Sequence, residues 1–307
     1  MLFSHTGLIS DFMLDIRRTI MLLALLLLLN GCSLMRLGYN QGPQLAWWWI
    51  DSYLDFNQEQ TPHAKQVIHN WFSWHRTTQL PEYADWLASV RSQIDGSLTS
   101  TQVCNWSEQL QNMLIPAFDQ AVQLGTPLIP QLKAAQLHHL EQRYSKSNSE
   151  FRSDFLQPDL NERKQASVKR TIKRIENLYG DIDKRQQHLI ATSIENSPFN
   201  PEAWMIERQR RQQDTLRTLR QLISETTSSE QPIASLRKLI EHTHRSNDPE
   251  YRAYQLKLTE YTCNFIARMH NLTTPHQRRH AHDKLKGWEI DMRMLIAENP
   301  INHAVLK

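Results

Sequence analysis

Glycine is scarce in this chain, with 8 residues among 307, and most of the 13 prolines fall at the ends of predicted segments. Tight turns between strands use glycine, so a β-rich fold would be expected to contain more of it. Alternation of apolar and polar residues, the pattern of a half-buried strand, is not convincing anywhere in the sequence. The sequence therefore predicts an all-α fold, as an elongated antiparallel helical bundle or as stacked helical hairpins.

Apolar residues recur three and four positions apart through most of the chain, which predicts helices with one buried face. Pro81 is predicted to end the helix over 58–79 and to begin another that runs to Asp95-Gly96. Thr99 is predicted to be an N-cap, and the prolines of Ser197-Pro198-Phe199-Asn200-Pro201 mark a sub-boundary near 196–201. The other predicted helices span 39–54, 99–125, 126–155, 159–179, a shorter segment ending at 196, 201–224, 231–245, 249–271 and 274–298.

The first thirty residues have the layout of an export signal. An apolar run from Ile20 to Leu29 follows Arg17-Arg18 and ends in Leu29-Asn30-Gly31-Cys32. The run is too short to span a bilayer as a helix. Its end resembles the lipobox of bacterial lipoproteins, in which the cysteine is acylated and becomes the first residue of the mature protein. An ordinary signal peptide with a chance cysteine is the alternative.

The lipobox resemblance implies a domain plan and a location. Residues 1–31 would be a signal peptide, 32–38 a linker anchored through acylated Cys32, and 39–299 an all-helical domain. Ser33 resembles the residue that lets lipoproteins move to the outer membrane, so we expect the protein in the cell envelope, facing the periplasm. The expected partners are membrane lipid, through acylated Cys32, and an envelope protein or peptide. A net charge of +3 gives no reason to expect nucleic acid.

A set of aromatic and polar residues near the start of the predicted domain resembles a family of uncharacterised bacterial lipoproteins, described as a domain of unknown function. The residues are Tyr39-Asn40, Trp48-Trp49, Asp51, Tyr53-Leu54-Asp55, Trp74-His75-Arg76 and Leu80-Pro81. The resemblance covers roughly residues 32–90. It implies an anchored helical protein and assigns no catalytic residues.

Two segments resemble a signature of small helical periplasmic stress chaperones, Leu-Thr-x-x-Gln. Leu98-Thr99-Ser100-Thr101-Gln102 fits it, and Leu272-Thr273-Thr274-Pro275-His276-Gln277 fits with one extra residue. The same pattern is also an ordinary helix start, in which a threonine caps the helix and a glutamine bonds back to it. A chaperone-like holdase is therefore the alternative to a plain binding or structural role.

Candidate catalytic and metal-binding patterns are weak. His276, His280 and Asp283 are spaced to share a helix face and are the nearest approach to a metal site, but neighbouring Arg and Lys residues favour a solvated face. Trp74 is interpreted as a packing residue. His75 and Arg76 are interpreted as capping residues or as bridges to acids such as Asp51, Asp55 or Glu82, and a titrating, anion-binding site is the alternative. Neither a phosphate-binding glycine loop nor a GxSxG elbow is present. We therefore expect no cofactor and a non-enzymatic role.

Two further groups of residues, three consecutive tryptophans and two cysteines, lead to predictions about packing and a disulfide. Trp47, Trp48 and Trp49 are consecutive, so in a helix they point about 100° apart and cannot share one core. At least one is expected to pack elsewhere, against other helices or at a membrane interface or partner. Cys104 and Cys263 permit one disulfide in an oxidising compartment, and two separate buried thiols on unrelated helices are an equal alternative.

Overall fold

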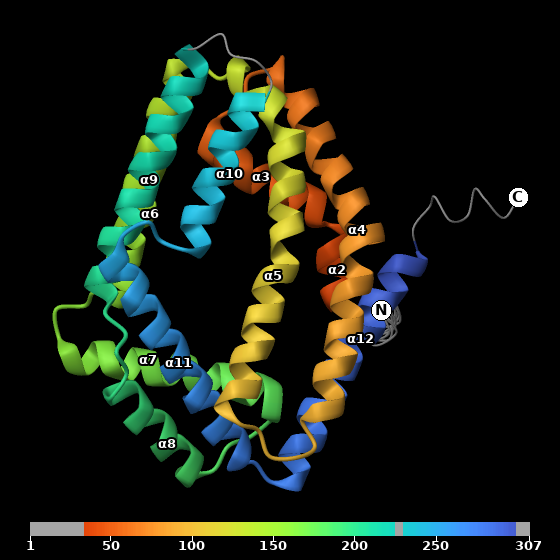
Figure 1. The fold of residues 1–307 in the computed structure, drawn as a ribbon, viewed down its shortest axis with the longest axis vertical. Coiled ribbons are helices and arrows are strands. Elements are labelled where there is room, and N and C mark those ends of the chain that lie inside the picture. Colours follow the sequence, from red (N-terminus) through yellow and green to blue (C-terminus); the bar gives the residue numbers. More distant parts are fainter. Residues whose placement is uncertain (1–33, 225–229, 299–307) are drawn as a thin grey trace, which may run out of the picture. The chain divides into compact units, whose positions relative to one another are not determined.

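The computed structural model describes residues 34–224 and 230–298, and every regular element in these ranges is helical (Figure 1). This confirms the all-α prediction. The chain divides into two units between Gln41 and Gly42. In the first, the described part forms helix α2 (Leu34–Asn40), which occupies most of the predicted linker. The predicted signal peptide, 1–31, and Cys32 lie outside the described residues.

The second unit contains the remaining described helices. They are α3 (Gly42–Leu54), α4 (Gln60–Gln93), α5 (Ser100–Gly125), the 3-10 helix η2 (Thr126–Gln131), α6 (Ala134–Phe155), α7 (Leu160–Tyr179), α8 (Lys184–Glu195), α9 (Pro201–Ser224), α10 (Glu230–His244), α11 (Pro249–Asn271) and α12 (Pro275–Ala297). Within the described ranges, no helix is both long and apolar enough to cross a membrane.

Six of these helices form a closed ring, which we call the first ring. Helix α3 packs on α4, α4 on α5, α5 on α10, α10 on α9, α9 on α6, and α6 back on α3. Helix η2 contacts α4, α5 and α9. Two clusters of buried side chains hold this ring together: Trp47, Ala64, Ile68 and Leu128 in one, and Leu137, Leu140, Leu216 and Leu219 in the other.

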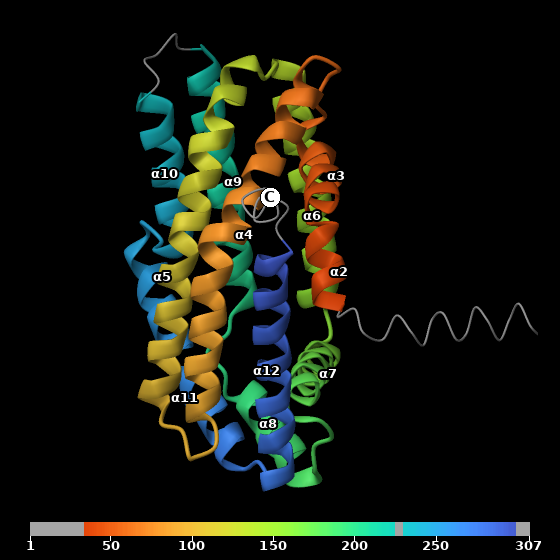
Figure 2. The same cartoon turned by 90° about the vertical axis from the view of Figure 1, so that its right-hand side faces the viewer.

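A second ring shares α4 and α5 with the first. It continues from α5 to α11, α8, α7 and α12, and closes where α12 packs along α4. Figure 2 shows α4 between α5 and α12. The chain passes from the second ring back to the first between α8 and α9. The break predicted near 196–201 coincides with this passage.

Four buried glutamines tie helix starts together, one pair in each ring. Gln60 and Gln136 exchange side-chain amide hydrogen bonds of 3.2 and 3.0 Å, and Gln186 and Gln277 do so at 2.8 and 2.9 Å. Each Oε1 also accepts the backbone N–H three residues earlier, and each Nε2 also donates to a backbone carbonyl. Both polar atoms of every amide are therefore satisfied.

The two Leu-Thr segments are both helix starts. Thr99 caps α5 and Thr274 caps α12. Each threonine hydroxyl oxygen accepts the backbone N–H of the glutamine three residues later, and each threonine backbone N–H donates to the side-chain oxygen of that glutamine. The N-cap prediction for Thr99 is confirmed. Because the capping box accounts for both segments, neither needs a chaperone-specific explanation.

The predicted end of a helix at Pro81 is wrong, since α4 continues through it to Gln93. Proline removes one backbone hydrogen bond and costs about 3 kcal/mol inside a helix. The neighbouring Leu80 and Ala84 are buried, with 3% and 0% of their surface exposed. Burial of this face and the packing of α4 along α12 offset the cost.

The predicted single helix over 126–155 is also wrong at its start. Residues 126–131 form the 3-10 helix η2, Leu132 is extended, and α6 begins at Ala134. Pro130 has no N–H to continue an α-helix, and its ring would clash with the preceding turn. The interruption lets η2 lie against three helices of the first ring.

Candidate functional site

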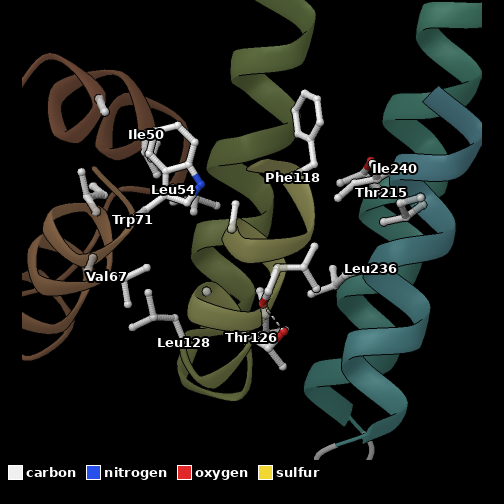
Figure 3. A pocket seen from close by; sticks show the side chains of 18 of the residues that line it. Ile50, Leu54, Val67, Trp71, Phe118, Thr126, Leu128, Thr215, Leu236 and Ile240 are labelled. Atoms are coloured by element: carbon white, nitrogen blue, oxygen red, sulfur yellow. Dashed lines mark hydrogen bonds between the residues drawn. The ribbon is translucent and has the colours of Figure 1, made fainter. Parts of the chain in front are cut away.

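The first ring surrounds a cavity of about 740 Å³ that is partly open to solvent, which we call the apolar cavity. Figure 3 shows aliphatic and aromatic side chains entering it from several helices, with those of α4 and those of α10 on opposite sides. Its volume lies within the range of about 300–1,000 Å³ that is typical of small-ligand sites. The principal lining residues are Ile50, Leu54, Val67, Trp71, Phe118, Val122, Leu128, Leu236 and Ile240.

Small residues on the inner faces of the helices create this space. Ala46, Ala64, Ala121 and Gly125 line the apolar cavity where larger side chains would fill it. A Cβ atom built on Gly125 would meet no other atom within 4 Å. The hydroxyl of Thr126, also in the lining, donates to the carbonyl of Val122 at 2.6 Å and so adds little free polarity (Figure 3).

A second cavity of about 500 Å³, which we call the polar chamber, adjoins the first. Both are lined by Trp49, Ile50, Leu54, Arg211, Thr215 and Thr243. The polar chamber also has the aromatic side chains of Tyr53, Tyr144, Trp204 and Tyr251, and the charged side chains of Glu207 and Arg208. Polar residues form a smaller share of the lining of the apolar cavity: Arg211, Asp214, Thr215, His242 and Thr243 beside Thr126.

Glu207 on α9 is the most buried charged residue at the site, with 4% of its surface exposed. It accepts hydrogen bonds from Nε and Nη2 of Arg210, at 2.8 and 2.7 Å, and from Nε of Arg211, at 2.7 Å. Burial alone would raise the pKa of Glu207, but the bonds from these two guanidinium groups outweigh it and hold the pKa below its usual value. Glu207 is therefore a carboxylate at neutral pH.

The three consecutive tryptophans of α3 point in different directions, as the helix geometry predicts. Trp47 is buried, stacks on Phe56 with ring centroids 5.8 Å apart, and carries the Lys65 ammonium 4.9 Å from its ring centre. Trp48 and Trp49 are 60% and 64% exposed. Trp49 also lines both cavities. A membrane or partner contact for these two rings stays a prediction.

Cys104 on α5 and Cys263 on α11 are joined by a disulfide in the structure, with Cα atoms 5.4 Å apart. Cys263 is 3% exposed and lies in a cluster with Leu98, Val103 and Ala267. The bond connects two helices of the second ring and lies away from both cavities.

The weak metal candidates are not brought together as a ligand set. His280 Nδ1 lies 2.9 Å from the carbonyl oxygen of Leu178, and His282 bonds to the Asp283 carboxylate and to Arg91. His276 is exposed. Within residues 34–224 and 230–298, no group of three or more His, Cys, Asp or Glu side chains is arranged to hold a metal ion.

The segment Trp74-His75-Arg76 lies within α4 and contacts side chains of α4 and the backbone of α12. The His75 ring stacks on Trp71, with centroids 4.6 Å apart, and meets Tyr83 edge-on at 5.5 Å. Burial lowers the pKa of His75 from 6.5 to about 4, so the ring is neutral at physiological pH. Arg76 donates to the carbonyl of Leu295 on α12. His75 therefore has a packing role, whereas the sequence predicted that it caps a helix or bridges to an acid.

Comparison with known protein families identifies the chain. Residues 52–252 match the model of a family of unknown function, DUF6279. The chain belongs to this family. No curated protein and no solved structure matches it significantly. The DUF6279 region contains α4 to α10 and with them most of the lining of both cavities. The Tyr39-Asn40 and Trp48-Trp49 motifs precede the DUF6279 region, whereas Trp74-His75-Arg76 lies inside it.

Sequence reasoning missed the residues of the cavities. Glu207, Arg210 and Arg211 are three and four positions apart, a spacing that predicts ion pairs on one helix face and was available in the sequence. No comparable spacing in the sequence indicated the apolar cavity. Its lining comes from six elements, and a helix face that borders a cavity has the same periodicity as one that packs in a core.

Proposed function

We propose that this protein is a non-enzymatic, lipid-anchored envelope protein that binds an apolar small molecule in the apolar cavity. The observation that carries the proposal is the cavity itself, about 740 Å³ of space lined mainly by aliphatic and aromatic side chains. Folded proteins rarely leave so much apolar space inside a ring of helices, because packing it would add stability. A bound apolar molecule would recover that stability.

The charged groups beside the cavity favour binding over catalysis. Glu207 is held as a carboxylate by two guanidinium groups, which makes it a poor donor or acceptor of protons near neutral pH. His75, buried and neutral, is not part of either lining. The polar groups that do reach the cavities are suited to orienting a ligand.

The envelope location rests on the lipobox-like segment ending at Cys32. An acyl anchor at this residue would hold the domain at a membrane surface, and α3, which lines the apolar cavity, begins ten positions later. A lipid-derived molecule is an apolar ligand that such a location would supply. The partner that delivers or receives it would be an envelope protein or peptide.

Ligand binding can be tested with N-phenyl-1-naphthylamine, a neutral probe whose fluorescence rises in apolar surroundings. The full chain is used with Cys32→Ser, so that no acyl group competes for the cavity. We expect saturable binding that Gly125→Trp weakens at least about tenfold, because the new ring fills the cavity without a clash at Cβ.

Gly287→Trp is the matched control. Gly287 is an exposed helical glycine of α12 outside the cavity, and a Cβ built on it also meets no atom within 4 Å. This variant should bind the probe like the parent protein. Equal affinity of the Gly125 variant and the parent would contradict binding in the apolar cavity.

A chaperone-like holdase is a second candidate, favoured by the exposed rings of Trp48 and Trp49. In that case suppression of the aggregation of an unfolded client would depend on Trp48, which does not line either cavity. The test compares Trp48→Ser with Gly125→Trp. Loss of suppression in the first alone would favour the holdase, and unchanged suppression in the first would exclude a role for Trp48.

A further inference from the structure

Arg211 lies where the apolar cavity meets the polar chamber and contributes to the lining of both. Its Nε donates to Glu207 at 2.7 Å, and its guanidinium carbon lies 5.9 Å from the centre of the Tyr251 ring. These contacts fix the side chain. Its Nη2 atom is buried and has no hydrogen-bond partner among the described residues. The guanidinium group of Arg211 is therefore fixed at the boundary between the apolar cavity and the polar chamber, and its Nη2 donor is unused.

In the lining of the polar chamber guanidinium groups outnumber carboxylates, and the carboxylate in the lining of the apolar cavity, Asp214, pairs with Arg210 and Arg217. Glu207 is shared between Arg210 and Arg211. Arg208, which also lines the polar chamber, bonds through Nε to Asn148 and through Nη2 to Ser147, both neutral groups. No carboxylate in the described ranges forms an ion pair with it. The polar chamber thus has two guanidinium groups in its lining and one carboxylate.

A third arginine, outside both linings, lies beside a residue that lines the polar chamber. Arg143 on α6 lies with its guanidinium carbon 5.1 Å from the ring centre of Tyr53, which lines the polar chamber. Its Nε is buried and makes no hydrogen bond within the described part of the chain. Guanidinium groups with unused donors in partly buried surroundings are suited to carboxylate and phosphate oxygens.

We propose that the ligand is an anionic amphiphile, whose alkyl chain occupies the apolar cavity and whose anionic group binds Arg211 at the entrance to the polar chamber. This inference rests on the proposed function and adds the class of the ligand. A carboxylate and a phosphate share the required chemistry, a negatively charged oxygen at the end of an apolar chain. A free fatty acid would supply the first and a phospholipid-derived molecule the second.

The test is displacement of N-phenyl-1-naphthylamine from the full chain carrying Cys32→Ser. The competitors are dodecanol, dodecanoate and dodecyl phosphate, which share one alkyl chain and differ in the terminal group. We expect at least one anion to bind about tenfold or more tightly than dodecanol, as a hydrogen-bonded charge pair predicts. The tighter of the two anions identifies the source of the ligand.

The variant Arg211→Gln should reduce the preference for the anion to within about threefold of dodecanol, and Arg211→Lys should retain part of it. Arg220→Gln is the matched control, because Arg220 is an exposed arginine of the same helix outside both cavities. It should keep the full preference. Dodecanol should bind Arg220→Gln as tightly as it binds the parent protein.

The outcomes separate the two proposals. Equal binding of dodecanol and both anions by the parent protein would overturn the inference and leave the proposed function standing. A preference for the anion that survives Arg211→Gln would overturn the assignment to Arg211. Failure of the probe and of all three competitors to bind would overturn the proposed function itself.

Discussion

The buried pair Gln186 and Gln277 should be a major source of stability in the second ring. Gln186 is fully buried and makes four hydrogen bonds. Its Oε1 accepts from the Asp183 N–H and from Gln277 Nε2, both at 2.9 Å, and its Nε2 donates to the Leu272 carbonyl at 3.1 Å and to Gln277 Oε1 at 2.8 Å. Gln186→Leu removes all four bonds and keeps a similar volume.

The expected cost follows from the groups that this substitution leaves without partners. They are the Asp183 N–H, the Leu272 carbonyl, and one donor and one acceptor site of Gln277. A buried polar group without a partner costs about 1–3 kcal/mol, and relaxation recovers part of the sum. We therefore expect Gln186→Leu to lower the free energy of unfolding by about 3 kcal/mol, and Gln277→Leu to have a similar effect.

The double variant should lose less free energy of unfolding than the two single variants combined. In each single variant the remaining glutamine has lost its partner amide, and in the double variant no such glutamine remains. We expect a coupling energy of about 1–2 kcal/mol. The assay is urea unfolding followed by the helical circular dichroism signal. Gln102→Leu is the control, since Gln102 bonds to Thr99 at a helix start without a buried partner, and it should cost about 1 kcal/mol or less. Additivity of the two single effects within about 0.5 kcal/mol would refute this reasoning.

Three further predictions concern the disulfide between Cys104 and Cys263, the partly buried His75 and the acyl anchor at Cys32. Replacing Cys104 and Cys263 by serine should lower the free energy of unfolding by up to about 5 kcal/mol, given their separation of 159 residues. Thiol titration of the denatured, unreduced Cys32→Ser protein should find no free thiol, and two would contradict the bond. Because the pKa of His75 is about 4 when folded and 6.5 in its ordinary state, the unfolded chain binds the proton first as the pH falls. Stability should therefore drop between about pH 6.5 and 4, by about 2–3 kcal/mol. His75→Phe should remove this contribution and leave that of His270, whose pKa burial also lowers, whereas exposed His69→Gln should leave both in place. Cys32→Ser should abolish acylation, so an unchanged mature mass and unchanged detergent partitioning would contradict the lipid anchor.

The helical fold could be predicted because its signals are local. Thr99 and Thr274 each precede a glutamine at the spacing of a capping box, and both start helices. Apolar periodicity and few glycines indicate helices without reference to distant residues. The errors arose at prolines. The chain tolerates Pro81 inside α4 because of packing against α12, which no local pattern reveals, whereas Pro130 does interrupt the structure.

The candidate site could not be predicted because it depends on how helices close into a ring. Ala64 and Gly125 read as ordinary small residues in sequence, and they leave space only because the helices that carry them close into the first ring with α9 and α10. That Nη2 of Arg211 has no hydrogen-bond partner likewise depends on the tertiary structure. Its neighbours in sequence show that Glu207 is within reach of Nε, but not that Nη2 is buried without a partner.

The most direct test of a ligand-binding cavity is photolabelling with a neutral alkyl diazirine, followed by mass spectrometry of the peptides. The account predicts saturable labelling of lining residues on three separate helices: Val67 and Trp71 on α4, Phe118 and Val122 on α5, and Leu236 and Ile240 on α10. Excess dodecanol should compete with it, and Gly125→Trp should suppress it. Labelling confined to the exposed Trp48, or labelling that does not saturate, would contradict the account.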